Sequence, residues 1–192
     1  MLHDGRPFVF VTVGTDHHRF DRLVEWVDDW MIEGGGAGRA RVFVQSGQAK
    51  PPRHASWAEL VGRDELHRLL ETASAVVCHG GPASITECRS AGIVPIVVPR
   101  DPRLGEHVDD HQILFTRRLA AAGKIHLARS ADRLAALLDE AVSCPEAFRV
   151  GPGADTAEQT VVEFERLVTG LLHGDDGSRH HRRVRALAGR RR

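Results

Sequence analysis

Short apolar runs alternate with longer amphipathic stretches along most of the chain. The apolar runs at residues 8–13, 41–45, 75–78, 94–98 and 124–127 are rich in β-branched side chains and end at glycine, proline or polar residues, as buried strands do. Residues 60–61 add a further short strand. Helical spacing of apolar residues follows at 19–31, 64–73, 84–91 and 108–122, and again after residue 130. This order predicts an α/β fold, a Rossmann-like parallel sheet with helices on both faces.

The last fifth of the chain differs from this pattern. The sequence GPGAD at 151–155 interrupts it, and residues 156–172 form a predicted amphipathic helix. From residue 173 onward there are seven arginines and two aspartates, which gives +5, while residues 1–172 carry 19 basic and 24 acidic side chains, which gives −5. We therefore expect one domain over 1–172 and a basic, disordered tail over 173–192.

Composition excludes several protein classes. With 42% hydrophobic and 27% charged residues, the chain resembles an ordinary globular protein with one core. No apolar run reaches the roughly 18 to 20 residues that span a bilayer, and the three cysteines form no CxxC pair. No stretch before residue 8 resembles a signal peptide. We expect a cytoplasmic protein. The Arg-rich tail lacks the interleaved aromatic residues of a nucleic-acid site, and an anionic membrane surface is the alternative to a solvated tail.

Three loops follow predicted strands and carry polar chemistry. They are residues 14–18, residues 79–82 and residues 100–112. In a parallel sheet, ligands bind at the carboxyl ends of the strands, where helix N-termini offer free N–H groups. The pair Gly80–Gly81 before a helix predicts a phosphate-binding turn. A capping box, in which Ser84 caps the helix and Glu87 bonds back, explains the same residues equally well. The chain has neither the P-loop motif GxxxxGK[ST] nor the dinucleotide motif GxGxxG.

The stretches VFVTVGTDHHRFDRLVEWV, VQSG, VVCHGGPASITECRSAGIVPIVVP and GEHVDDHQ occur in this order between residues 8 and 128. Together they resemble the nucleotide-sugar-binding half of glycosyltransferase family 28. Within that family they are similar to the short, separately encoded catalytic subunits of bacterial exopolysaccharide synthesis and of the dolichol-linked N-acetylglucosaminyltransferase of eukaryotes. The resemblance implies the C-terminal half of a GT-B glycosyltransferase.

The resemblance also implies roles for individual residues. Glu87 matches the glutamate that binds the ribose hydroxyls, and Val61 matches the residue whose backbone contacts the uracil edge. The turn at His79, Gly80 and Gly81, with Ser84 at the helix start, matches the diphosphate cradle. Glu106, His111 and Gln112 match the positions that contact the donor sugar, and the first loop, with Gly14 and Thr15, faces the same cleft.

The function implied is inverting transfer of a sugar from a UDP-sugar to a lipid-linked saccharide acceptor. The acceptor-binding half is expected on a membrane-anchored partner subunit, which recruits the chain to the inner face of the membrane. Helix 156–172 is a candidate for docking that partner, with packing on its own sheet as the alternative. No cofactor and no metal are expected. A UDP-sugar epimerase and a nucleotide-sugar-sensing regulatory subunit are the competing functions.

Histidines and cysteines offer further candidate sites. His17 and His18 follow the first strand and are candidate general bases, or simply solvated loop residues. His107 and His111 are four residues apart, so on a helix they would share one face as a possible metal pair, but no third ligand is fixed by their spacing. Cys78 with His79 and Cys88 is a weaker zinc candidate, and Cys78 fits a core position better.

Overall fold

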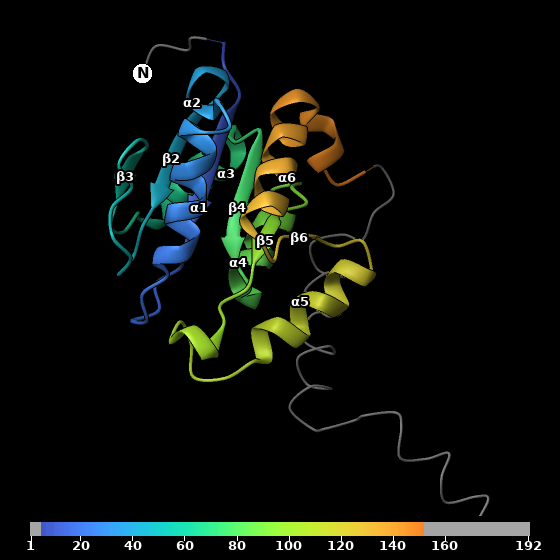
Figure 1. Cartoon of the computed structure of the whole chain (residues 1–192). Helices are drawn as coiled ribbons and strands as arrows, with labels where there is room; N and C mark the ends of the chain where they lie inside the picture. The colour runs from blue at the N-terminus through green and yellow to red at the C-terminus, as the bar shows by residue number, and fades with distance from the viewer. Residues whose placement is uncertain (1–4, 152–192) are drawn as a thin grey trace, which may run out of the picture.

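The computed structural model of the protein describes residues 5–151. These residues form a six-stranded, wholly parallel sheet in the order β3-β2-β1-β4-β5-β6 (Figure 1). The strands are β1 (Phe8–Thr12), β2 (Arg41–Gln45), β3 (Ser56–Ala58), β4 (Ala75–His79), β5 (Ile96–Val98) and β6 (His126–Leu127). The predicted α/β class and the parallel sheet are confirmed.

Helices cover both faces of the sheet. Figure 1 shows α1 (Asp21–Ile32) and α6 (Ala131–Ser143) in front of it, with α3 (Arg63–Thr72) and α4 (Pro82–Ser90) behind. Helix α5 (His111–Ala121) packs its Phe115 and Leu119 into the same core as α3 and α4. The remaining helical turns are α2 (Gly36–Arg39) and two 3-10 turns, Pro102–Leu104 and Pro145–Phe148.

Alternation along the strands divides the core in two. Successive side chains of a strand point to opposite faces, so Val9 and Val11 of β1 pack with α1 and α6, while Phe10 packs with α3, α4 and α5. All three side chains are fully buried. Because both faces are covered, the strands read as continuous apolar runs in the sequence.

Several element boundaries differ from the sequence prediction, and three of them have a clear physical cause. The strand expected at 60–61 is wrong: β3 lies earlier, at Ser56–Ala58, where it pairs with Phe43–Gln45 of β2. Strand β5 begins at Ile96 rather than residue 94, since Pro95 has no N–H to donate to a neighbouring strand. Helix α5 begins at His111 rather than residue 108, after a turn in which the Asp109 carboxylate accepts the His111 N–H at 3.1 Å.

Two other predictions concern residues outside 5–151, namely the helix 156–172 and the basic tail 173–192. The domain boundary drawn between them stays a prediction. Among the described helices, none has the length and apolar character needed to cross a membrane.

Candidate functional site at the carboxyl edge of the sheet

The loops that follow β1 and β4 meet at the carboxyl ends of the strands and border a cavity of about 480 Å³. Its walls include six residues that the sequence analysis assigned to nucleotide binding: Gly14, Thr15, Val61, His79, Ser84 and Glu87. These residues come from the ends of β1 and β4, the first two turns of α4 and the loop before α3. The structure therefore brings the predicted nucleotide site together in space, while the role of each residue stays a prediction.

The turn between β4 and α4 leaves the start of that helix open. Helix α4 begins at Pro82, which is favoured at the first helical position, and its N-cap is Gly81. Among residues 5–151 no side chain caps this helix, so the predicted capping box is wrong: Ser84 already lies inside the first turn. The side chains of Ser84 and Glu87 border the cavity instead. Helix α4 is nine residues long. Its uncapped N-terminus carries free N–H groups and partial positive charge, the features that bind a phosphate.

His79 lies between two glycines at this turn. A Cβ atom at Gly14, which has a φ of 81°, or at Gly81 would collide with the imidazole ring. The Nδ1 atom of His79 is buried and has no hydrogen-bond partner among residues 5–151. Burial, with a smaller contribution from the charge of Arg100, lowers the pKa of His79 to about 4. The ring is therefore neutral at pH 7 and has one nitrogen that donates and one that accepts.

The loop after β1 gathers an acid and histidines. The Asp16 carboxylate accepts hydrogen bonds from the His18 backbone N–H at 2.7 Å and from its ring Nδ1 at 2.6 Å. The Nε2 atom of His107 lies 3.7 Å from the same carboxylate, and His17 is largely exposed. Burial tends to raise the pKa of Asp16, but the bonds from His18 and the charge of Arg100 lower it to about 2. Asp16 was missed by the sequence analysis, although its position beside two histidines after a strand was a usable signal.

The residues that could hold a metal ion in the structure are not the pair predicted from the sequence. His107 precedes α5, so it does not share a helical face with His111, and that predicted pair is wrong. Within the described residues, potential ligand atoms of Asp16, His17 and His18 lie within 4.8 Å of one another. Cys78 and Cys88 are both buried in the core, where a hydrogen bond to Cys88 and burial raise the pKa of Cys78. This confirms the core position expected for Cys78.

Arg100, which no motif singled out, ties the loops after β1 and β5 together. Its fully buried guanidinium donates to the carbonyls of Val13 at 2.8 Å, His18 at 2.8 Å and Glu106 at 3.0 Å. The carbon of the guanidinium lies 4.8 Å from the centroid of the Phe20 ring. Arg100 thus fixes the backbone on both sides of the histidine-bearing loop.

The three residues predicted to contact the donor sugar differ in their exposure and in the hydrogen bonds they already make. Both oxygens of Glu106 accept from Arg22, at 2.8 and 2.7 Å, and one accepts from the Asp101 N–H as well. This carboxylate is buried and holds the loop, and its predicted contact with a sugar is untested. Gln112 lies against Gly80 of the predicted phosphate-binding turn, since a Cβ at Gly80 would come within 3.1 Å of the Gln112 side chain. His111 is exposed, with its ring 3.2 Å from Asp109.

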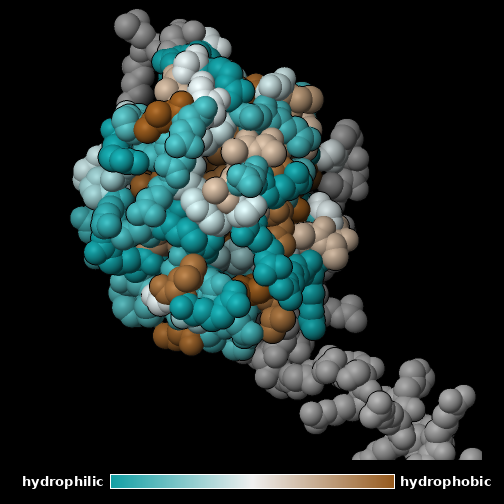
Figure 2. Space-filling view, in the orientation of Figure 1, coloured by the Kyte–Doolittle hydropathy of each residue, from teal (hydrophilic) through white to brown (hydrophobic). Residues whose placement is uncertain are grey.

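The carboxyl edge also exposes apolar surface. Figure 2 shows brown patches on a mainly teal surface, several of them toward the lower end, where Figure 1 places the arrowheads of the strands. The loops of that edge carry three strongly exposed large residues, Leu60 (59%), Leu104 (61%) and Val108 (74%). Contiguous exposed apolar surface commonly marks an interaction site.

Comparison with known proteins agrees with this arrangement. A model of the glycosyltransferase family 28 C-terminal domain matches residues 8–165. Over 118 residues the chain is 29% identical to a protein of Chromohalobacter salexigens named UDP-N-acetylglucosamine--N-acetylmuramyl-(pentapeptide) pyrophosphoryl-undecaprenol N-acetylglucosamine transferase, a match covering 60% of this chain and 31% of that protein.

Among solved structures, the glycotransferase of kitacinnamycin has a TM-score of 0.56 at 18% identity, covering 86% of this chain and 40% of its own. The spinosyn forosaminyltransferase has a TM-score of 0.54, also at 18% identity, covering 85% and 44%. At these identities the likeness establishes the fold. The chain spans less than half the length of each of these proteins.

Proposed function

The chain belongs to glycosyltransferase family 28, and from this premise we propose that its domain binds a UDP-sugar and transfers the sugar to a lipid-linked acceptor. The observation that carries the proposal is the cavity beside the uncapped start of α4, bordered by Ser84, Glu87 and His79. The name of the similar protein from Chromohalobacter salexigens supports the choice of substrates, because it contains a UDP-sugar donor and a pyrophosphoryl-lipid acceptor.

In this proposal the diphosphate rests on the turn at Gly80 and Gly81. The free N–H groups of the first turn of α4 stabilise the negative charge that grows on UDP as it departs. Neutral His79 donates a hydrogen bond to the same group. Glu87 binds the ribose hydroxyls, and the backbone near Val61 contacts the uracil edge. Gln112, beside the phosphate turn, contacts the sugar together with His111.

The reaction is a single displacement at the anomeric carbon. The acceptor hydroxyl oxygen forms the new bond on the face opposite the diphosphate, the bond between the anomeric carbon and the phosphate oxygen breaks, and UDP leaves with that electron pair. His18 is the proposed base for the hydroxyl proton. Because anionic Asp16 can only accept, Nδ1 of His18 carries the hydrogen in their 2.6 Å contact, and Nε2 is left to accept a proton.

We further propose that an acceptor-binding half on a membrane-anchored partner subunit covers the carboxyl edge, at the inner face of the membrane. The exposed Leu60, Leu104 and Val108 support this, since they place apolar side chains on loops of the carboxyl edge. A donor domain without its acceptor half can bind a nucleotide but scarcely transfer, because correct orientation of two reactants is worth up to about 7 to 11 kcal/mol of the barrier.

Glu87 gives the sharpest test of donor binding. In Glu87→Ala, loss of a charge-assisted bond should weaken UDP binding by about 1 to 3 kcal/mol in titration calorimetry. Glu25→Ala, an exposed glutamate on α1, is the matched control and should bind UDP as the wild type does. Equal UDP affinity in the two variants would remove Glu87 from the nucleotide site.

Transfer is tested with membranes that carry a candidate acceptor-binding subunit, with UDP-N-acetylglucosamine as the probe donor. The full-length chain should be nearly inert by itself and active with those membranes. Gln112→Ala should lower turnover while UDP affinity stays nearly unchanged. Transfer at the same rate without membranes would refute the two-component proposal.

The proposed chemistry does not use a metal, because backbone N–H groups and the helix N-terminus carry the diphosphate charge. Activity should therefore persist in EDTA. The group Asp16, His17 and His18 is the place to look if it does not. Activity that disappears with chelator and returns with magnesium or manganese would contradict this part of the proposal.

A further inference from the structure

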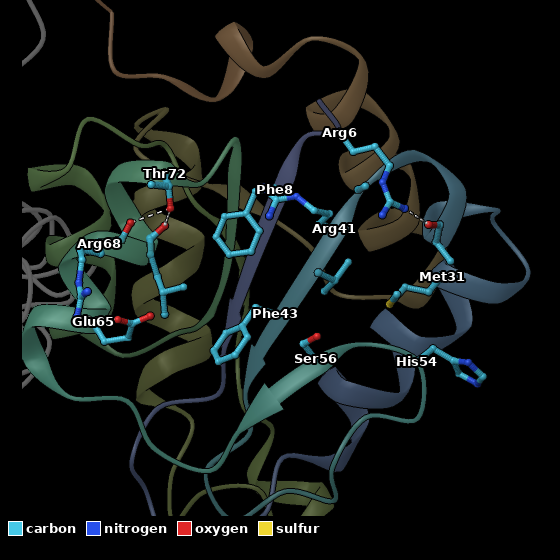
Figure 3. Close-up of a pocket in the computed structure, with 14 residues that line it drawn as sticks. Arg6, Phe8, Met31, Arg41, Phe43, His54, Ser56, Glu65, Arg68 and Thr72 are labelled. Atoms are coloured by element: carbon cyan, nitrogen blue, oxygen red, sulfur yellow. Dashed lines mark hydrogen bonds and ion pairs between the residues drawn. The ribbon is translucent and has the colours of Figure 1, made fainter. Parts of the chain in front are cut away.

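A second cavity, of about 550 Å³, lies at the opposite end of the sheet, where β1 and β2 begin and α3 ends. We call it the amino-end groove. Figure 3 shows the rings of Phe8 and Phe43 on its floor, with Arg68 and Thr72 of α3 on one wall. The wall across from α3 includes Met31 and Arg6 (Figure 3). Strand β3 pairs only with Phe43–Gln45, so Arg41 and Val42 border the groove with no neighbouring strand on that side among residues 5–151.

The groove combines an apolar floor with a basic rim. Phe8 and Phe43 are half-buried. Three arginines line it, Arg6, Arg41 and Arg68, against one glutamate, Glu65, which gives a formal charge of +2. The guanidinium carbon of Arg41 lies 5.3 Å from the Phe8 ring centroid. An occupant that suits this groove has an apolar face and acidic side chains.

The chain itself passes close to this groove where the described residues end. Arg149 pairs with Ile93, and its guanidinium donates to the Ala73 carbonyl at 2.7 Å. Ala73 directly follows Thr72 of the groove wall, and the N–H of the next residue, Ser74, donates to the Phe8 carbonyl at 2.7 Å. The backbone at Arg149 thus lies within one arginine side chain of Ala73, the residue after the groove wall.

The residues that follow have the complementary composition. Residues 155–172 carry four acidic side chains and one arginine, a formal charge of −3. Helical spacing places Val161, Phe164, Val168 and Leu171 on one side of the helix predicted over 156–172. Such a helix is about 25 Å long. The family match runs to residue 165, past the last described residue, so this segment belongs at least in part to the same domain.

We propose that residues 156–172 of this chain dock in the amino-end groove, with their apolar side on Phe8 and Phe43 and their acidic residues facing Arg6 and Arg41. In this proposal residues 152–155 are the linker between the described end of the chain and the docked segment. This assignment is independent of the proposed sugar transfer. It places the segment on the domain's own sheet, at the end away from the candidate site, and leaves the carboxyl edge for a partner.

A cysteine at the groove tests this docking directly. Ser56 is exposed in the described structure and lines the groove, and Cys78 and Cys88 are too buried to react. Ser56→Cys is made in a Cys144→Ser background, and the rate of thiol labelling is compared between the full-length chain and a chain ending at Gly153. Labelling should be at least tenfold faster in the shortened chain. Glu25→Cys, exposed on α1, is the control and should react at the same rate in both.

Exchanging the charges of the segment and the groove tests the same docking in the full-length protein, without a truncation. In full-length protein, Glu163→Arg with Glu165→Arg should speed labelling at the groove, and adding Arg6→Glu with Arg41→Glu should restore protection. Arg117→Glu on α5, outside the groove, should restore nothing. Equal labelling of full-length and shortened chains overturns the proposal. Protection that appears only when membranes with the acceptor-binding subunit are added also overturns it, in favour of docking on the partner.

Discussion

At the carboxyl end of the sheet, charged groups are enclosed. Backbone carbonyls accept hydrogen bonds from the Arg100 guanidinium, while the Glu106 carboxylate accepts from Arg22 and from the Asp101 N–H. At the amino end, the charged groups stand on the rim of an apolar groove, as Arg6 and Arg68 do. Both ends belong to one parallel sheet. The difference follows from strand direction, because helix N-termini with free N–H groups gather only where the strands end. Anion chemistry therefore favours the carboxyl end, and apolar docking suits the other.

The contrast between the two ends of the sheet predicts that Arg100, the buried cation at the carboxyl end, contributes most to stability. Arg100→Met keeps much of the side-chain volume but leaves three buried carbonyl acceptors without this donor. The free energy of unfolding should fall by about 3 kcal/mol or more in urea denaturation. Arg117→Met, exposed on α5, should leave it unchanged. A similar small effect in both variants would show that Arg100 does not brace the loops.

Because His79 is enclosed at this end, we expect the free energy of unfolding to depend on pH. Unfolded His79 binds a proton near pH 6.5, but folded His79 does so only near pH 4. Between these values the unfolded state holds more protons, so the free energy of unfolding falls as pH falls through this window. The full loss is about 3 kcal/mol and is complete below pH 4. His79→Asn should lose correspondingly less stability than wild type between pH 7 and pH 4. His67→Asn, exposed on α3, should keep the wild-type slope.

For the turn that we propose to hold the diphosphate, at Gly80 and Gly81, we expect a smaller effect, on ligand binding. In Gly81→Ala the new methyl group meets the His79 ring, so the ring or the turn must shift. UDP affinity measured by calorimetry should fall about tenfold, or about 1.4 kcal/mol. Gly38→Ala in α2 has open space around its added methyl group and should bind as the wild type does. Unchanged affinity in Gly81→Ala would mean that the ligand does not depend on the geometry of this turn.

The rim of the amino-end groove predicts the smallest effect. Arg68 forms a surface ion pair with Glu65 at 2.8 Å and is 69% exposed. Arg68→Ala should change the free energy of unfolding by no more than about 0.5 kcal/mol, because water screens such pairs. A loss as large as that of Arg100→Met would erase the contrast between the two ends of the sheet.

Much of this architecture was predictable from the sequence because its signals are local. Apolar runs separated by amphipathic stretches indicated the parallel sheet, and the glycines after the first and fourth strands indicated the site. Local signals failed where two of them competed. Ser84 and Glu87 have the spacing of a capping box, yet the helix begins two residues earlier at Pro82, after its N-cap Gly81, and both residues border the cavity. The strand expected at 60–61 failed because pairing with β2, and not apolar content, selects Ser56–Ala58.

The sequence by itself determined the order of strands and helices and the position of the glycine turn after β4, since these depend on residues a few positions apart. The family resemblance indicated most of the residues that border the cavity at the carboxyl edge. Only the tertiary structure decided what holds the site in place. Arg100 binds carbonyls 82 and 87 residues away, and His79 fits between two glycines from different loops. Hydrophobic periodicity contains no information on such contacts, because they arise only when β1, β4 and β5 lie side by side in the folded sheet.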